Sequence, residues 1–144
     1  MSVARICSRT VVTTRPDESV RAAARRMYRD RVGTLVVMDP GGRELPIGFV
    51  TDRDIVTRCV AAGLDSEAES VASIMTVPVT TIHEDASVED AVALMSEVTI
   101  RRLVVTDSSN RLVGVLALDD VLECLAGEAN AIGRLLPRHP PALL

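Results

Sequence analysis

The 144-residue sequence has almost no aromatic residues: it holds one tyrosine, Tyr28, one phenylalanine, Phe49, and no tryptophan. Hydrophobic residues still make up 47% of the chain. The core must therefore be built from Val, Leu, Ile, Ala and Met side chains. An aliphatic, β-branched core of this kind is typical of buried strands covered by helices. The length fits one globular domain or two very small ones.

Long hydrophobic runs and paired cysteines are also absent. The longest apolar runs, such as 35–38 and 112–118, are far shorter than the roughly 18 residues that span a bilayer. The first residues lack the apolar run and cleavage site of a secretion signal, so we expect a cytoplasmic protein with no membrane span. Cys7, Cys59 and Cys124 are odd in number and have no C-x-x-C spacing. This argues against a disulfide framework and a zinc site, and we expect reduced, mostly buried cysteines.

Lysine is missing, and all sixteen basic residues are arginines. The net charge of −4 is uneven, because residues 1–34 hold eight arginines and three acids while the remainder holds eight arginines and seventeen acids. The arginines at 21, 25, 26 and 29 follow helical spacing, which favours a solvated helix face. Nucleic-acid binding through this region is an alternative, but it would need more positive charge and aromatic side chains for stacking.

The sequence repeats itself after 66 to 68 residues. Thr13-Thr14 and Ser19-Val20 return as Thr80-Thr81 and Ser87-Val88, Leu35-Val36-Val37 returns as Leu103-Val104-Val105, and Gly48 returns as Gly114. The two copies differ by two residues in length across one turn region, which contains 40–42 in the first copy and 108–110 in the second. Turns tolerate such length changes.

Each copy predicts the same order of elements. A short strand, 11–14 or 79–82, leads into a helix that opens with acids and hydroxyls. Apolar residues follow at helical spacing, namely Val20, Ala23, Ala24 and Met27 in the first copy and Val88, Ala91, Val92 and Met95 in the second. Two apolar β-type runs and a second helix, from near Thr51 or Leu118, complete a β-α-β-β-α unit.

A unit of about 60 residues cannot close a core alone. The predicted fold class is therefore α/β (α+β), with two tandem repeats packed face to face about a pseudo-two-fold axis. We place the first repeat at 1–66, the second at 67–136, and a flexible Pro-rich tail at 137–144. The linker between the repeats is expected at 61–73.

The segment 48–56, Gly-Phe-Val-Thr-Asp-Arg-Asp-Ile-Val, carries the most chemical information because a strand ends and a helix begins within it. Thr51 and Asp54 have the spacing of an N-terminal capping box, which is a structural role. A second interpretation is that the helix start and Arg53 receive a phosphate while Asp54 accepts from ribose hydroxyls. The spacing alone leaves both interpretations open.

The duplicated unit, the Gly-h-h-Thr-x-x-Asp segment at 48–54 and the Ile74-Met75-Thr76 opening of the second copy together resemble a CBS domain pair, the regulatory Bateman module. The resemblance runs from about Ile6 to Leu122. Among CBS-domain proteins, the sequence most resembles the small stand-alone bacterial ones.

The resemblance implies a nucleotide cleft between the copies, for AMP, ADP or ATP, with S-adenosylmethionine or NAD as further candidates. In such modules the aspartate holds the ribose, the hydroxyl residue and nearby arginines approach phosphate, and the opening strand of the other copy encloses adenine. Transferred to this sequence, the ligand-binding residues are Thr51, Arg53, Asp54, Thr76, Val77, Val79, Thr80, Ile100, Arg101 and Arg102.

The pseudo-symmetric second site is expected to be weak or empty. It would use Asp120, Cys7 and Val32, but Ala117 has no hydroxyl for a phosphate or a helix cap, and Asp119 adds negative charge. We therefore expect about one nucleotide per chain.

These observations predict a regulatory module that senses an adenine nucleotide and is not an enzyme. It would act through an unknown protein partner or as a ligand-responsive homodimer joined by its second helices, with no catalytic cofactor and no metal. His83 fits a polar loop rather than a metal site, and no Ser/His/Asp or Cys/His arrangement is present. The alternatives are a ligand-free dimeric adaptor and a nucleic-acid-binding protein.

Overall fold

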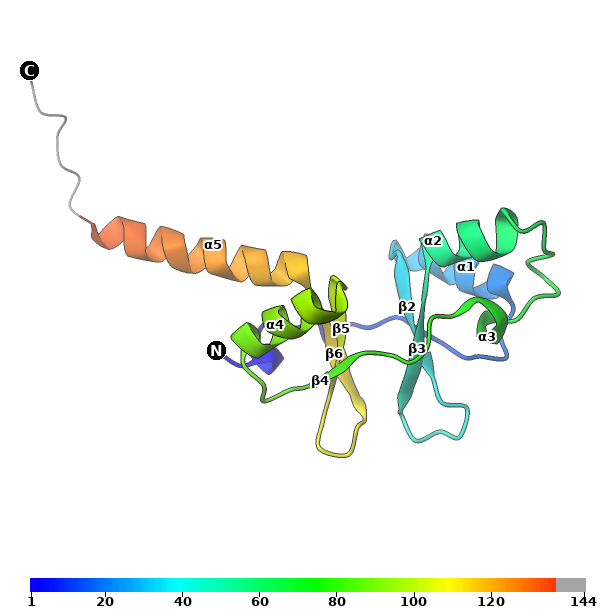
Figure 1. Cartoon of the computed structure of the whole chain (residues 1–144), viewed down its shortest axis with the longest axis horizontal. Coiled ribbons are helices and arrows are strands. Elements are labelled where there is room, and N and C mark those ends of the chain that lie inside the picture. The colour runs from blue at the N-terminus through cyan, green and yellow to red at the C-terminus, as the bar shows by residue number, and fades with distance from the viewer. Residues whose placement is uncertain (137–144) are drawn as a thin grey trace, which may run out of the picture.

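The computed structural model describes residues 1–136, and these contain two copies of one sheet-and-helix unit (Figure 1). The first copy contains β1 (Thr13–Thr14), α1 (Val20–Asp30), β2 (Thr34–Met38), β3 (Pro46–Thr51), α2 (Asp52–Asp54) and its π-helical continuation η2 (Ile55–Val60). The second contains β4 (Thr81–His83), α4 (Val88–Val98), β5 (Arg102–Thr106), β6 (Leu112–Ala117) and α5 (Leu118–Leu135). The predicted β-α-β-β-α order is confirmed. The tail expected at 137–144 lies outside the described residues.

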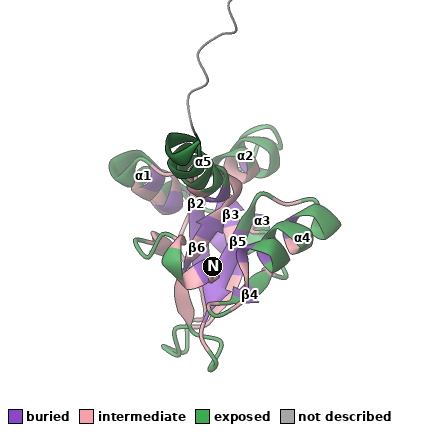
Figure 2. Cartoon of the chain, turned by 90° about the vertical axis from the view of Figure 1, so that its left-hand side faces the viewer, coloured by how far each residue is buried: buried purple, intermediate pink, exposed green. Residues whose placement is uncertain are grey.

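Each copy forms a mixed three-stranded sheet with the same pattern. The strand orders are β1-β2-β3 and β4-β5-β6, with the first pair parallel and the second antiparallel in each. The two sheets lie next to each other in the middle of the molecule, with α1 and α2 outside one and α4 and α5 outside the other (Figure 1). Burial is concentrated on the sheets and on the inner helix faces (Figure 2). This is the predicted packing of two repeats, and it leaves the ends of β3 and β5 near the boundary between them.

The helices α1 and α4 begin at serine caps in equivalent positions. The Ser19 hydroxyl accepts from the backbone N–H of Ala22, and the Ser87 hydroxyl accepts from that of Asp90, both at 3.0 Å. Val20, Ala23 and Met27 of α1, and Val88, Ala91 and Met95 of α4, are buried as their spacing predicts. Val92, assigned to the same apolar face, is 38% exposed because it lies at the edge of that face.

The opening segment of each repeat packs on the core of the other repeat. Val3, in the short 3-10 helix η1 (Val3–Arg5), is fully buried in the second core, and its N–H donates to the Ala86 carbonyl at 2.9 Å. The short helix α3 (Val71–Ile74) is buried in the first core, and the Val71 N–H donates to the Glu18 carbonyl at 2.8 Å. The expected linker at 61–73 is therefore partly a core element, and the two repeats are interlocked.

The helix α5 extends well beyond the sheets (Figure 1). Of its residues, Val121 is buried, whereas Leu122 and Leu125 are about half exposed at 55% and 51%. The second helices, by which we expect a homodimer to be joined, therefore carry exposed apolar residues here and at Val56 and Val60 of η2. No helix within residues 1–136 is long and apolar enough to cross a membrane.

Candidate functional site

A cavity of about 610 Å³ lies between the two repeats, which is a typical size for a small-molecule site. The first repeat supplies residues from β2, β3 and α2. The second supplies the segment before β4 and the start of β5. The lining residues are Thr34, Phe49, Thr51, Arg53, Asp54, Thr76, Pro78, Thr80, Thr99, Ile100, Arg101 and Arg102.

Eight of the ten residues predicted for the main site line this cavity. They come from three segments that are far apart in the sequence, 51–54, 76–80 and 100–102. Val77 and Val79 are not among the lining residues, and the Val77 side chain is exposed. The fold therefore brings eight of the predicted residues together and leaves these two valines outside the cavity.

Thr51 and Asp54 form a complete capping box at the start of α2. The Thr51 hydroxyl accepts from the Asp54 N–H at 3.0 Å, and the Asp54 Oδ2 accepts from the Thr51 N–H at 2.9 Å. The Asp54 Oδ1 lies 3.7 Å from Nε of Arg58, and the Asp54 side chain is only 13% exposed. The structural interpretation of this pair is correct. A carboxylate has about four acceptor sites, so the cap leaves Asp54 able to accept further hydrogen bonds.

The segment that closes the cavity is fixed across β3 by the backbone. The Phe49 N–H donates to the Thr76 carbonyl at 3.1 Å, and the Thr76 N–H donates to the Phe49 carbonyl at 2.7 Å. Gly48 allows the segment around Thr76 to lie this close to β3, because a Cβ there would lie 2.8 Å from the Thr76 carbonyl oxygen. Arg58 adds a further tie by donating to the Ile74 carbonyl at 3.0 Å. The site wall is therefore held rigidly on one side.

Sequence reasoning did not identify four lining residues, Thr34, Phe49, Pro78 and Thr99. The signal for Thr34 was available, because the repeat places it at the position equivalent to Arg102. Its Oγ1 is buried and has no hydrogen-bond partner among the described residues. Phe49 lies two residues before Thr51 on β3. Its place in the cavity could have been predicted, because side chains two residues apart on a strand lie on the same face.

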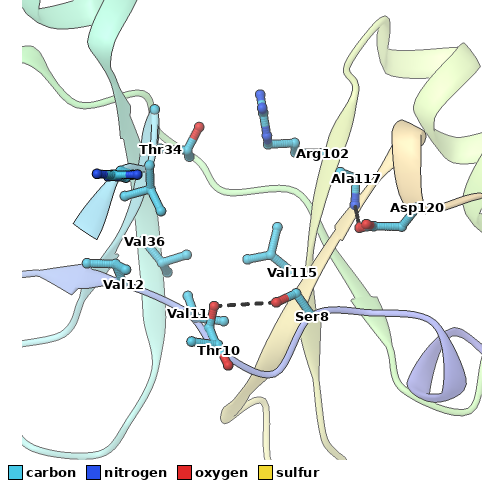
Figure 3. A pocket seen from close by; sticks show the side chains of 13 residues that line it. Ser8, Thr10, Val11, Val12, Thr34, Val36, Arg102, Val115, Ala117 and Asp120 are labelled. Carbon is cyan, nitrogen blue, oxygen red and sulfur yellow. Dashed lines mark hydrogen bonds between the residues drawn. The ribbon is translucent and has the colours of Figure 1, made fainter. Parts of the chain in front are cut away.

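A second cavity of about 330 Å³ lies between the repeats at the pseudo-symmetric position (Figure 3). It contains two of the three predicted residues, Asp120 and Val32. Cys7 does not line it; the Cys7 thiol lies 3.9 Å from the Ala4 carbonyl, and burial raises its pKa above the ordinary value. Thr34 and Arg102 line both cavities.

Only half of a cap is present at the second cavity. The Asp120 Oδ2 accepts from the Ala117 N–H at 2.9 Å, as Figure 3 shows, but the Ala117 side chain offers no acceptor in return. The Ser8 hydroxyl contacts the Thr10 carbonyl at 3.4 Å at the base of this cavity. The second cavity is smaller than the first and has fewer side-chain hydroxyls at its helix start.

The remaining candidates for chemistry lie apart from both cavities. The three cysteines are free, as expected, but Cys59 alone is buried while Cys7 and Cys124 are half-buried. His83 Nδ1 accepts from the Asp85 N–H at 3.2 Å, which is a local loop contact. Within the described part of the chain, no three His, Cys, Asp or Glu side chains cluster as metal ligands.

Comparison with known proteins gives consistent matches. The family model described as the CBS domain matches residues 3–61 and 71–127. The CBS domain-containing protein YhcV of Bacillus subtilis is 36% identical over 111 residues, which cover 77% of this chain and 76% of YhcV. The structure of CBS domain protein PAE2072 from Pyrobaculum aerophilum, complexed with AMP, has a TM-score of 0.77 and 27% identity, covering 88% of this chain and 99% of that one. The CBS domain pair of protein MJ0100, in complex with 5′-methylthioadenosine and S-adenosyl-L-methionine, has a TM-score of 0.76 and 26% identity, covering 89% and 98%.

Proposed function

The chain belongs to the CBS domain family, and from that premise we propose that it is a regulatory module that senses an adenosine ligand without catalysing a reaction. The observation that carries the proposal is the cavity of about 610 Å³ between the repeats, where a partly buried carboxylate and three arginines lie within one site. A carboxylate suits ribose hydroxyls and arginines suit phosphate. We expect one ligand per chain, because the second cavity is smaller and its helix start has only half of the cap.

Each part of the proposed site has a role that its chemistry supports. Asp54 accepts from the ribose hydroxyls with the carboxylate lone pairs that the cap leaves free. Ile100 and Phe49 supply the apolar surface that an adenine ring needs, and Thr80 supplies a hydroxyl beside it. Arg53, Arg101 and Arg102 receive the phosphates. The ligand candidates are AMP, ADP and ATP, with S-adenosylmethionine or NAD as further ones.

The ligand signal must reach another protein surface, and the second helices are the best-supported route. Leu122, Leu125 and Ile132 of α5 are all more than half exposed and recur at spacings of three and seven residues. Such an apolar stripe on a helix favours association. We propose that two chains form a homodimer through this face, and that an unidentified protein partner distinguishes the liganded packing of the repeats from the unliganded one. A cytoplasmic location stays a prediction.

A ligand-free dimeric adaptor is the main alternative, and the capping box favours it. Thr51 and Asp54 are already hydrogen-bonded to the backbone, so their presence is explained without a ligand. Nucleic-acid binding has less support, because Arg21 and Arg26 of the basic helix α1 are paired with Glu67 and Glu18 at 2.7 and 2.6 Å.

The test is to identify small molecules released from the purified protein by mass spectrometry and to follow thermal unfolding with added AMP, ADP and ATP. A ligand at 100 times its dissociation constant should add about 2.7 kcal/mol of stability. Asp54→Ala should abolish this gain. Asp120→Ala is the matched control, because it removes the equivalent 2.9 Å bond to the backbone at the second helix start and should leave the gain intact. Unmoved unfolding curves with every nucleotide would support the adaptor instead.

A further inference from the structure

Positively charged side chains from both repeats line the larger cavity. Arg101 and Arg102 lie at the start of β5, Arg53 lies in α2, and Asp54 is the single carboxylate among the lining residues. Guanidinium groups keep their charge at any pH at which the protein is folded. Asp54 is also partly compensated by Arg58, whose Nε lies at 3.7 Å. The cavity therefore has an excess of positive charge.

The fold itself does not require arginines at positions 101 and 102. The first repeat builds the same strand start with Gly33 and Thr34, and the backbone contact is conserved between the copies. The Asp52 N–H donates to the Gly33 carbonyl at 3.0 Å, and the Leu118 N–H donates to the Arg101 carbonyl at 2.9 Å. The side chains at this position are therefore free to serve another purpose.

The protein leaves most of this charge uncompensated. Among residues 1–136, Arg53 and Arg102 make no ion pair, whereas Arg21 is paired with an acid at 2.7 Å. Arg101 lies 3.7 Å from Asp119, but the two side chains are 73% and 80% exposed. An exposed pair at this distance contributes little, so it restrains Arg101 without neutralising the positive charge of the cavity.

From this arrangement we infer that the cavity selects adenosine ligands with two or more phosphates and disfavours S-adenosylmethionine, an inference that rests on the proposed function. A diphosphate offers several anionic oxygens to three guanidinium groups, each of which can bind two of them. S-adenosylmethionine carries a sulfonium cation where those phosphates would lie. Asp119 tunes the selection, because its carboxylate competes with the ligand for Arg101.

Titration calorimetry at low ionic strength tests this selection by measuring the affinities for adenosine, AMP, ADP and S-adenosylmethionine. Charge-assisted hydrogen bonds of the usual strength predict that ADP binds about tenfold more tightly than AMP, and AMP about tenfold more tightly than adenosine. S-adenosylmethionine should bind no more tightly than adenosine. The ADP affinity should fall as salt is raised, because the arginines are open to solvent.

Three variants connect the preference to the named residues. The double variant Arg101→Gln with Arg102→Gln should bind adenosine as before and lose most of the preference for ADP. Arg43→Gln is the matched control, because Arg43 is also 73% exposed and lies 3.5 Å from an aspartate, Asp39, but outside the cavity. Asp119→Asn should raise the ADP affinity about threefold and leave the adenosine affinity unchanged. Misfolding would lower the affinity, so it cannot explain such a gain.

The outcomes separate this inference from the proposed function. If adenosine and ADP bind equally, if S-adenosylmethionine binds most tightly, or if the double variant keeps its ADP preference, the selection by phosphate is wrong while ligand sensing stands. If no adenosine compound binds the wild-type protein, the proposed function is wrong and this inference with it.

Discussion

Replacing Gly48 by alanine should push the segment around Thr76 away from β3 and open one wall of the larger cavity. The new Cβ would lie 2.8 Å from the Thr76 carbonyl oxygen, which is backbone and cannot rotate aside. Relief requires the strand and the segment to separate, and both backbone hydrogen bonds between Phe49 and Thr76, at 3.1 and 2.7 Å, would lengthen. The effect follows from one added methyl group.

The expected loss of stability is about 1–3 kcal/mol, the sum of two backbone hydrogen bonds at about 0.5–1.5 kcal/mol each. Urea unfolding should report it as a lower midpoint with an unchanged slope, because the surface exposed on unfolding is the same. The same variant should bind adenine nucleotides more weakly, since Thr76 and Thr80 would move relative to Thr51.

Gly127→Ala is the matched control for this substitution. Gly127 lies within α5, and a Cβ there would meet no atom within 4 Å. Alanine at an exposed helix position is favoured over glycine by about 0.5–1 kcal/mol, so this variant should be more stable than the wild type. The reasoning is refuted if Gly48→Ala is as stable as the wild-type protein and binds nucleotide unchanged.

Three further predictions concern the caps, a thiol and the dimer. Thr51→Ala removes an N-cap acceptor and should cost about 0.5–2 kcal/mol of stability. Ala117→Thr supplies such an acceptor and should gain about 0.5–1 kcal/mol. Chemical unfolding tests both variants, and a loss of stability in Ala117→Thr would contradict the account. Burial raises the pKa of the Cys7 thiol, so the unfolded chain loses this proton at lower pH than the folded chain. The stability that Cys7 contributes should be complete below about pH 8.5 and fall as the pH rises through its folded pKa, and Cys7→Ala should flatten that decline in unfolding curves measured from pH 7 to 10. Leu125→Glu should convert dimer to monomer in analytical ultracentrifugation with unchanged circular dichroism, and a dimer that persists would exclude this face of α5.

Much of the fold could be predicted because the two copies carry the same local signals. Ser19 and Ser87 cap equivalent helices, and the apolar residues that follow them are buried at the predicted spacing. The capping box of Thr51 and Asp54 followed from spacing alone. These features depend on neighbours within four residues, which is the range over which sequence patterns are informative.

The interlocking of the repeats was missed, although the sequence held a signal for it. Ser2-Val3-Ala4 and Ser70-Val71-Ala72 are the same triplet 68 residues apart, which marks a sixth shared element. Their burial could not be read from the sequence, because η1 and α3 are too short to show a helical period. Which core each one joins depends on long-range contacts, as the Val3 and Val71 backbone bonds illustrate.

Eight of the ten residues predicted for the site line the larger cavity. All ten were transferred from the family resemblance, and two of them, Val77 and Val79, lie outside the lining. Thr99 belongs to the site only because the two repeats face each other across the pseudo-two-fold axis. Contacts of that kind are set by how the copies pack and not by any local pattern.

The most direct test of the central claim is a crystal structure of the protein grown with ADP. The account predicts one nucleotide per chain in the larger cavity, with a ribose hydroxyl on Asp54 and the phosphates against Arg101 and Arg102. A structure in which ADP occupies the smaller cavity beside Asp120 instead, or in which ADP binds outside both cavities, would contradict it.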